Sequence, residues 1–185
     1  MDAWVWVVIV AAVVAVAVVG ALVLSQRRRR ARLQERFGPE YDRAVEGDRR
    51  GRVERDLDDR VRRREELDIR PLASGARERY AAQWHELQAR FVDQPGEAVD
   101  RADTLVSEVM RERGYPVDDF DEQAGLVSVD HPGVVENYRT AHGVYVRKTQ
   151  ERASTEELRE AVVAYRSLFE ELLSEDGERA DTADT

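Results

Sequence analysis

The 185-residue sequence contains no cysteine and only three histidines. Without cysteine the chain has no disulfides, no thiolate metal sites and no cysteine nucleophile, which suits a reducing compartment. The motifs HExxH, GxSxG, paired Glu-x-x-His and the glycine-rich phosphate loop are also missing. These absences argue against a hydrolytic site or a metal centre, and we expect no enzyme activity, no cofactor and no bound metal ion.

Charge is missing from one long stretch, residues 3–24, which consists mainly of valine and alanine. At about 1.5 Å of rise per residue, a helix of this length spans roughly 33 Å, enough to cross the core of a bilayer. Trp4 and Trp6 suit a membrane interface. We therefore predict a transmembrane helix over residues 1–25. A cleaved signal peptide is the alternative, which the acidic Asp2 and the length of the apolar run disfavour.

Five arginines follow this apolar run: Arg27, Arg28, Arg29, Arg30 and Arg32. Basic residues beside a membrane helix stay in the cytoplasm. We therefore expect a single-pass protein of the cell membrane, with its N-terminus outside, its C-terminal domain in the cytoplasm and the arginines attracted to the anionic headgroups of the lipid bilayer. Binding of nucleic acid is the alternative, but the position beside the apolar run favours lipid, so we expect no nucleic acid partner.

Residues 26–71 contain many basic and acidic side chains in a mixed order. Val53, Leu57 and Val61 recur every four positions among these charges, which is typical of a narrow stripe on a solvated helix. We predict a charged helical stalk or linker over this region. A coiled coil is the alternative, although three apolar residues are fewer than such a seam needs.

Acidic residues dominate the rest of the chain. Residues 71–185 carry 13 basic and 25 acidic side chains, whereas residues 1–70 carry 16 and 13. We expect the basic part to lie close to the membrane and the acidic part to be repelled from it. The last segment, residues 175–185, predicts an acidic disordered tail.

Three stripes of apolar residues at spacings of three and four predict amphipathic helices between these regions. The stripes are Tyr80, Trp84, Leu87 and Phe91, then Val99, Ala102, Val106 and Val109, and finally Leu158, Val162, Tyr165, Phe169 and Leu172. Ser154 and Glu157 match a capping box at the start of the last helix. We predict an all-α fold with a bundle of about four helices over residues 72–174, and we leave residues 117–129 as a connection of uncertain form.

The polar segment 128–142 lies within this predicted bundle and contains two of the three histidines. Pro132 suits the first turn of a helix, so we interpret Asp130 or His131 as its cap. His142 would then share a face with apolar residues of the same helix, which favours a structural role. His131 and His142 would lie roughly 16 Å apart along that helix, too far to share a metal ion.

An enzyme is the least favoured of three classes of function that we consider for this chain. A deep cleft that held Asp130, His131 and Arg139 together would favour it. No spacing in the sequence requires such a cleft.

Several segments resemble a group of bacterial single-pass membrane-anchored proteins, typical of actinobacteria but not confined to them, for which no activity is known. The segments are RFGPEYDRAV (36–45), LDIRPL (67–72), RFVDQP (90–95), RGYPVDDF (113–120) and SVDHPGVVENYRTAH (128–142). The resemblance covers nearly the whole chain after the apolar run. It implies a membrane-tethered, cytoplasmic helical protein, and it carries no catalytic or binding residue.

Two other classes of function fit these features. The first is a membrane-anchored cytoplasmic interaction or scaffold protein, whose partner besides the bilayer is another protein, because the chain combines an apolar segment, a spacer and an acidic helical domain. The alternative is a membrane-tethered regulatory or sensor domain that binds a small ligand between helices. The aromatic and histidine side chains that could line such a site are Trp84, Tyr115, Tyr138 and His142.

Overall fold

The computed structural model describes the backbone of residues 3–183, together with the side chains of Trp4 and of residues 12–174. This described part consists of eight helices and contains no strand, which confirms the all-α prediction. The helices are α1 (Ala3–Phe37), α2 (Pro39–Gly47), α3 (Arg50–Glu65), α4 (Ala76–Arg90), α5 (Pro95–Arg113), α6 (Phe120–Asp130), α7 (Val135–Thr149) and α8 (Thr155–Ala183).

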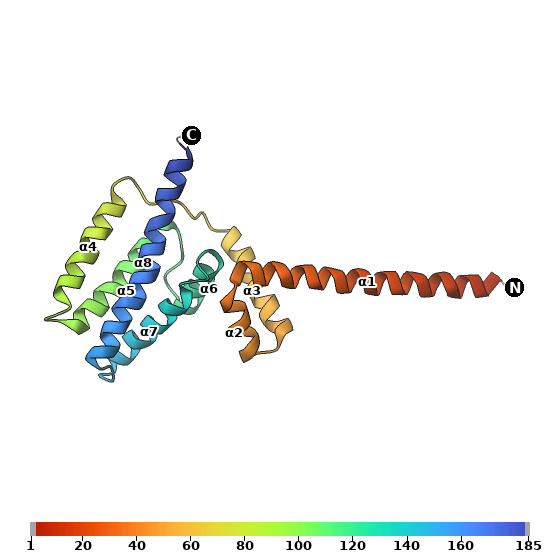
Figure 1. Ribbon diagram of the computed structural model, residues 1–185, viewed down its shortest axis with the longest axis horizontal. Coiled ribbons are helices and arrows are strands. Elements are labelled where there is room, and N and C mark those ends of the chain that lie inside the picture. Colours follow the sequence, from red (N-terminus) through yellow and green to blue (C-terminus); the bar gives the residue numbers. More distant parts are fainter. Residues whose placement is uncertain (1–2, 184–185) are drawn as a thin grey trace.

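The first helix, α1, projects as a single long rod from the other seven (Figure 1). The prediction of a transmembrane span is not confirmed, since among the residues that the structure describes no helix is long and apolar enough to cross a membrane. Part of the predicted span, residues 1–25, lies outside the described residues: the backbone of residues 1–2 and the side chains of residues 1–3 and 5–11.

The end of α1 folds together with α2 and α3, and we call this part, residues 26–65, the base. Gly38 breaks α1 with a φ of +46°, and Pro39 begins α2 in the first turn, as the sequence predicts. Val53 and Leu57 of α3 are buried against α1 and α2. The apolar stripe that suggested a solvated stalk therefore packs in a second small core instead.

Helices α4 to α8 form the bundle, in which α8 packs on both α7 and α5, and α4 packs on α5 (Figure 1). The predicted stripes face this core, since every residue of the α5 and α8 stripes is buried. The α4 stripe is buried as well, except for the half-buried Phe91. Burial of these side chains, each contributing about 1.5–3 kcal/mol, gives the bundle its main stabilisation.

Helix α6 occupies the region that the sequence left as a connection. Its residues from Gln123 to Val129 are all buried, because the bundle covers one side and the base covers the other. A helix that is buried all round shows no amphipathic period, so no stripe marked it in the sequence. Asp119 caps its start by accepting a hydrogen bond from the backbone N–H of Glu122 at 2.8 Å.

The segment around Pro132 corrects one sequence-based interpretation. Asp130 is the last residue of α6 and His131 is its C-cap, so neither caps the start of a helix. Helix α7 begins only at Val135, after a turn that contains Pro132. The proline disfavours helical backbone at the preceding His131, and α6 therefore ends there.

The start of helix α8 agrees with the sequence-based prediction, and its end does not. The capping box at its start is confirmed: the Glu157 N–H donates to Ser154 Oγ at 3.3 Å, and the Ser154 N–H donates to Glu157 Oε2 at 2.8 Å. Its end extends through Ala183. Residues 175–183, for which the sequence predicts a disordered tail, are thus helical.

Gly114 at the end of α5 is the glycine whose replacement we expect to be most costly. Its φ of +98° disfavours any other residue, and a Cβ there would overlap the backbone carbonyl oxygen of Asp68. We expect Gly114→Ala to lower the free energy of unfolding of the detergent-solubilised chain by on the order of 3 kcal/mol in denaturant melts. Gly51→Ala is the control, since its Cβ would meet open space within α3, and it should be neutral or slightly stabilising. Equal effects of the two changes would contradict this account.

Candidate functional site

The base and its junction with the bundle form the most distinctive site of the described chain. Its core consists of six buried apolar side chains, namely Leu33, Phe37, Tyr41, Val53, Leu57 and Val129. Phe37, at the last position of α1, is fully buried among them. The helix that carries the exposed apolar segment therefore ends inside a folded core.

A buried carboxylate, Glu54 of α3, holds α1 against the base. Its Oε1 atom accepts hydrogen bonds from Arg30 Nε at 3.0 Å and from the Tyr41 hydroxyl at 3.2 Å. Arg29 donates to the Glu54 carbonyl oxygen at 3.3 Å and forms an ion pair with Asp58. Burial, together with the nearby Glu54 carboxylate, raises the pKa of the Tyr41 hydroxyl, so Tyr41 stays a hydrogen-bond donor.

A second buried carboxylate, Glu40 of α2, joins the base to the bundle. Its Oε1 atom accepts from Arg60 of α3 at 3.1 Å and from Arg139 of α7 at 2.8 Å. Arg60 also lies 2.7 Å from Asp56 and 3.4 Å from the Ser128 hydroxyl of α6. One carboxylate thus binds arginines from two helices that belong to different parts of the fold.

A third carboxylate, Asp130 at the end of α6, completes the junction. Its Oδ2 atom accepts from Arg64 Nε of α3 at 2.5 Å and from the Tyr115 hydroxyl at 2.5 Å. Burial, reinforced by the hydrogen bond to Asp130, raises the pKa of the Tyr115 hydroxyl far above its usual value. The contact between base and bundle is therefore mainly ionic, with Val129 as the one residue of the bundle in the described core of the base.

The five arginines after the apolar run divide into two groups. Arg29 and Arg30 are held by α3 within the base. Arg27, Arg28 and Arg32 are exposed, and within the described chain no carboxylate pairs with them. Only this second group is available to an outside anion.

The four side chains proposed to line a ligand site lie in three different places. Trp84 of α4 stacks on Phe169 of α8, with ring centroids 4.6 Å apart. Tyr115 bonds Asp130 at the junction with the base, as described above. Only Tyr138 and His142 of α7 lie together, where both contact the ring of Phe120.

The environment of His142 is a packed polar cluster. Its ring stacks on Phe120 at a centroid distance of 3.6 Å, and its Nδ1 atom lies 3.3 Å from Asp103 Oδ1. The same carboxylate oxygen accepts a hydrogen bond from the Tyr165 hydroxyl at 2.7 Å. The His142 side chain is 23% exposed, so it lies at the edge of the core rather than inside it.

The other groups considered in the sequence lie apart from His142. His131 is buried near Glu171 of α8, with its Nδ1 atom 3.7 Å from the carboxylate. Arg139 binds Glu40, and Asp130 binds Arg64 and Tyr115. His131, Arg139 and Asp130 therefore each interact with a different part of the fold. Within the residues that the structure describes, no group of three or more histidine or acidic side chains could hold a metal ion.

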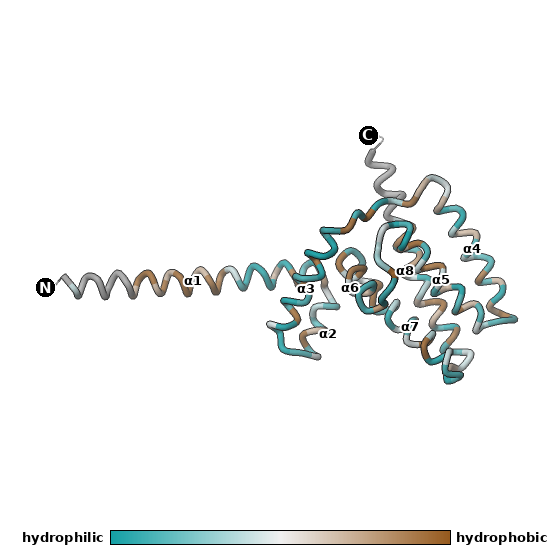
Figure 2. Tube along the Cα trace, turned by 180° about the vertical axis from the view of Figure 1, so that it is seen from behind, coloured by the Kyte–Doolittle hydropathy of each residue, from teal (hydrophilic) through white to brown (hydrophobic). Residues whose placement is uncertain are grey.

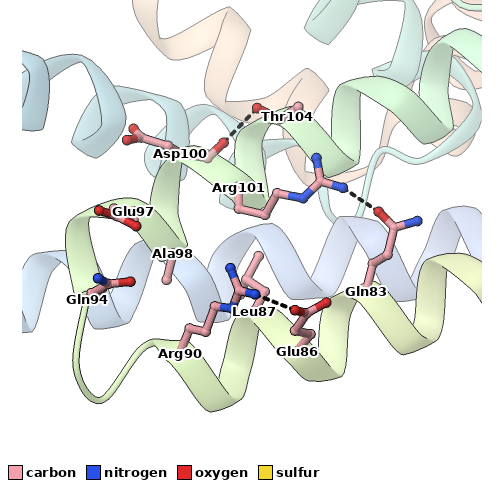
Figure 3. Close-up of a pocket in the computed structure, with 10 residues that line it drawn as sticks. All are labelled: Gln83, Glu86, Leu87, Arg90, Gln94, Glu97, Ala98, Asp100, Arg101 and Thr104. Carbon is pink, nitrogen blue, oxygen red and sulfur yellow. Dashed lines mark hydrogen bonds and ion pairs between the residues drawn. The ribbon is translucent and has the colours of Figure 1, made fainter.

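A half-open groove of about 450 Å³ lies between α4 and α5 (Figure 3). Its polar walls include Glu86, Arg90, Glu97, Asp100 and Arg101. In Figure 3 Arg101 reaches across to Gln83, and Arg90 pairs with Glu86 at 2.5 Å along the same helix. None of the four proposed ligand-lining side chains belongs to this groove.

No sequence pattern distinguishes Glu40 or Glu54 from the other acidic residues. Both are members of a set of 38 acidic residues, and their burial depends on how helices far apart in sequence meet. Glu40 lies within RFGPEYDRAV, one of the segments that carry the resemblance described above.

Comparison of the chain with protein-family models, with curated proteins and with solved structures gives no match. The resemblance noted from the sequence segments therefore stays an expectation. Function is inferred below from the residues and contacts of this chain alone.

Glu40 and Glu136 both contact Arg139, which makes them a matched pair for mutation. Glu40 is buried and binds two arginines, so we expect Glu40→Ala to leave them without compensation and to cost on the order of 3 kcal/mol. The Glu136 side chain is 47% exposed, and we expect Glu136→Ala to cost less than about 1 kcal/mol. Denaturant melts of the solubilised chain measure both, and a larger loss for Glu136→Ala would refute the assignment.

Proposed function

We propose that this chain is a membrane-anchored cytoplasmic helical scaffold that binds another protein. The apolar segment of α1 is the observation that carries the proposal. Eight large apolar side chains between residues 13 and 24 are 44–73% exposed, and Figure 2 shows this hydrophobic part of α1 away from the rest of the chain. Leaving such side chains in water costs on the order of 10 kcal/mol, so an environment outside the described chain is expected to cover them.

The distribution of these side chains supports a bilayer as that environment. A partner helix covers one stripe, whereas the exposed residues include neighbours such as Val13 and Val14, Val18 and Val19, or Val23 and Leu24, which point to different faces. The uncharged run of residues 3–24 has the length of a bilayer core. The arginines that follow it favour a cytoplasmic location for the base and the bundle.

The groove between α4 and α5 supports a protein partner. Sites for small ligands are mostly enclosed and apolar, but this groove is half open and carries charges of both signs, such as Glu97 and Arg101. Polar side chains of another protein fit such a surface better. Photo-cross-linking from Gln94 in native membranes tests for this partner, and adducts limited to copies of the chain itself would contradict it.

The side chains that could line a ligand site between helices are engaged in contacts within the fold, which favours the scaffold over a sensor domain. Trp84 and Tyr115 are taken up by contacts with Phe169 and Asp130. Tyr138 donates a hydrogen bond to Gln123 at 2.9 Å in the core. Each of these three side chains is thus held by contacts within the fold.

The anchor is tested by the resistance of the full chain to extraction from membranes with alkaline carbonate. We expect the native chain to stay in the membrane pellet, and the double variant V16R/V19R to be released, because each arginine at the centre of a membrane helix costs about 2.5–3.5 kcal/mol. V92R/V163R is the matched control, since both valines are exposed in the bundle, and it should stay in the pellet.

The orientation is tested on the same chain with alkaline phosphatase fused after Thr185. The phosphatase is active only outside the cytoplasm, so we expect an inactive fusion. Release of the native chain by carbonate would contradict the anchor, and an active fusion would contradict the orientation.

A further inference from the structure

We propose that the turn between α2 and α3 forms a second contact with the membrane surface, and that it binds the phosphate groups of anionic lipids together with the arginines that follow the apolar segment. This inference rests on the proposed anchor. It adds to the membrane contact the α2–α3 turn, which lies about 20 residues after the arginines at 27–32.

The exposed arginines that form no ion pair within the chain identify the surface that we propose to contact the membrane. Most arginines of residues 1–70 are held by carboxylates or carbonyl groups of the chain, as Arg29, Arg30 and Arg60 are. Arg36 and Arg70 are also exposed, but they donate to the carbonyl oxygens of Val129 and Glu112. The other six exposed arginines of residues 1–70 that form no ion pair within the described chain are Arg27, Arg28, Arg32, Arg49, Arg50 and Arg55, of which Arg55 donates only to the Gly51 carbonyl oxygen of its own helix. They form two groups, one after the apolar run and one at the α2–α3 turn.

The contacts of the base bring these two groups close together. Arg30 of α1 binds Glu54 of α3 at 3.0 Å, and Arg29 pairs with Asp58 one turn further along α3. Val53, in the first turn of α3, is buried in the same core as Leu33 of α1. The first turn of α3 is therefore packed beside the polar part of α1.

Figure 1 shows how this turn faces the free part of α1. Along the long axis of the molecule, the start of α3 lies closer to the N-terminal end of α1 than α2 or any helix of the bundle does. Arg30 follows the last residue of the apolar run, Leu24, by six positions, which corresponds to about 9 Å along a helix. That distance is close to the Debye length of about 8 Å at physiological salt, so a charge at the level of Arg30 still acts on the headgroups.

The distribution of charge along the molecule supports the same orientation. The α2–α3 turn lies on the side of the folded part from which α1 projects (Figure 1). Residues 71–185, which contain the bundle, carry 25 acidic and 13 basic side chains. An anionic surface would attract the base and repel the bundle.

The chain contains no cysteine, which allows a single label at the proposed contact. We would label Gly51→Cys in the full chain, since a Cβ there meets nothing within 4 Å, and reconstitute the protein in nanodiscs of phosphatidylcholine with or without phosphatidylglycerol. A quencher attached to the lipid headgroups reports contact. Ala82→Cys on the exposed face of α4, in the bundle, is the control position.

We expect the Gly51 label to be quenched at least about twofold more in anionic than in neutral nanodiscs, and the Ala82 label to be quenched in neither. The triple variant R49E/R50E/R55E should abolish the difference. The matched control R77E/R111E/R152E, which reverses three exposed arginines of the bundle, should leave it unchanged. Salt at about 1 M, where the Debye length is about 3 Å, should also abolish it.

The outcomes separate this inference from the anchor. A chain that fails to enter nanodiscs would overturn the proposed anchor. A chain that enters them but shows equal quenching at Gly51 in neutral and anionic lipid, or the same difference after R49E/R50E/R55E, would overturn the second contact and leave the anchor in place.

Discussion

Glu40 of α2 accepts hydrogen bonds from Arg60 of α3 and Arg139 of α7 with the same carboxylate oxygen. Burying a carboxylate costs several kcal/mol unless it is paired, so this residue is stable inside the protein only while both arginines remain in place. Few apolar contacts join the base to the bundle, with Val129 as the bundle's one buried residue in the described core of the base. The relative position of the two parts therefore depends on directional ionic contacts, which fix an angle better than an apolar surface does.

This arrangement connects the apolar helix to the rest of the chain more firmly than the charged stalk predicted from the sequence would. A charged stalk would let the bundle move freely, but the last residue of α1, Phe37, is fully buried in the base. Arg30 and Glu54 hold α1 to α3, and Asp130 holds α3 to the end of α6. A membrane-anchored scaffold built in this way would present its groove between α4 and α5 at a fixed orientation to the membrane. The exposed arginines at the base are consistent with such an orientation.

The sequence predicted those parts of the fold that are amphipathic. The stripes of α4, α5 and α8 and the capping box at Ser154 are found as expected, because one side of each helix faces the core and the other faces water. Helix α6 was not predicted, because it is buried on both sides and shows no amphipathic stripe. The stripe of α3 was interpreted as solvated, because the surface that covers it comes from α1 and α2. The junction could not be found from the sequence, because burial of Glu40 depends on Arg139, 99 residues away.

The central claim is that the base joins α1 rigidly to the bundle. Distance measurement by double electron–electron resonance tests it most directly, with spin labels at Gln26→Cys on the exposed surface of α1 and at Ala82→Cys on α4. Since the native chain has no cysteine, the two labels are the only ones present. We expect one narrow distance distribution for the full chain in nanodiscs. A broad distribution, of the kind that a flexible linker produces, would contradict the claim.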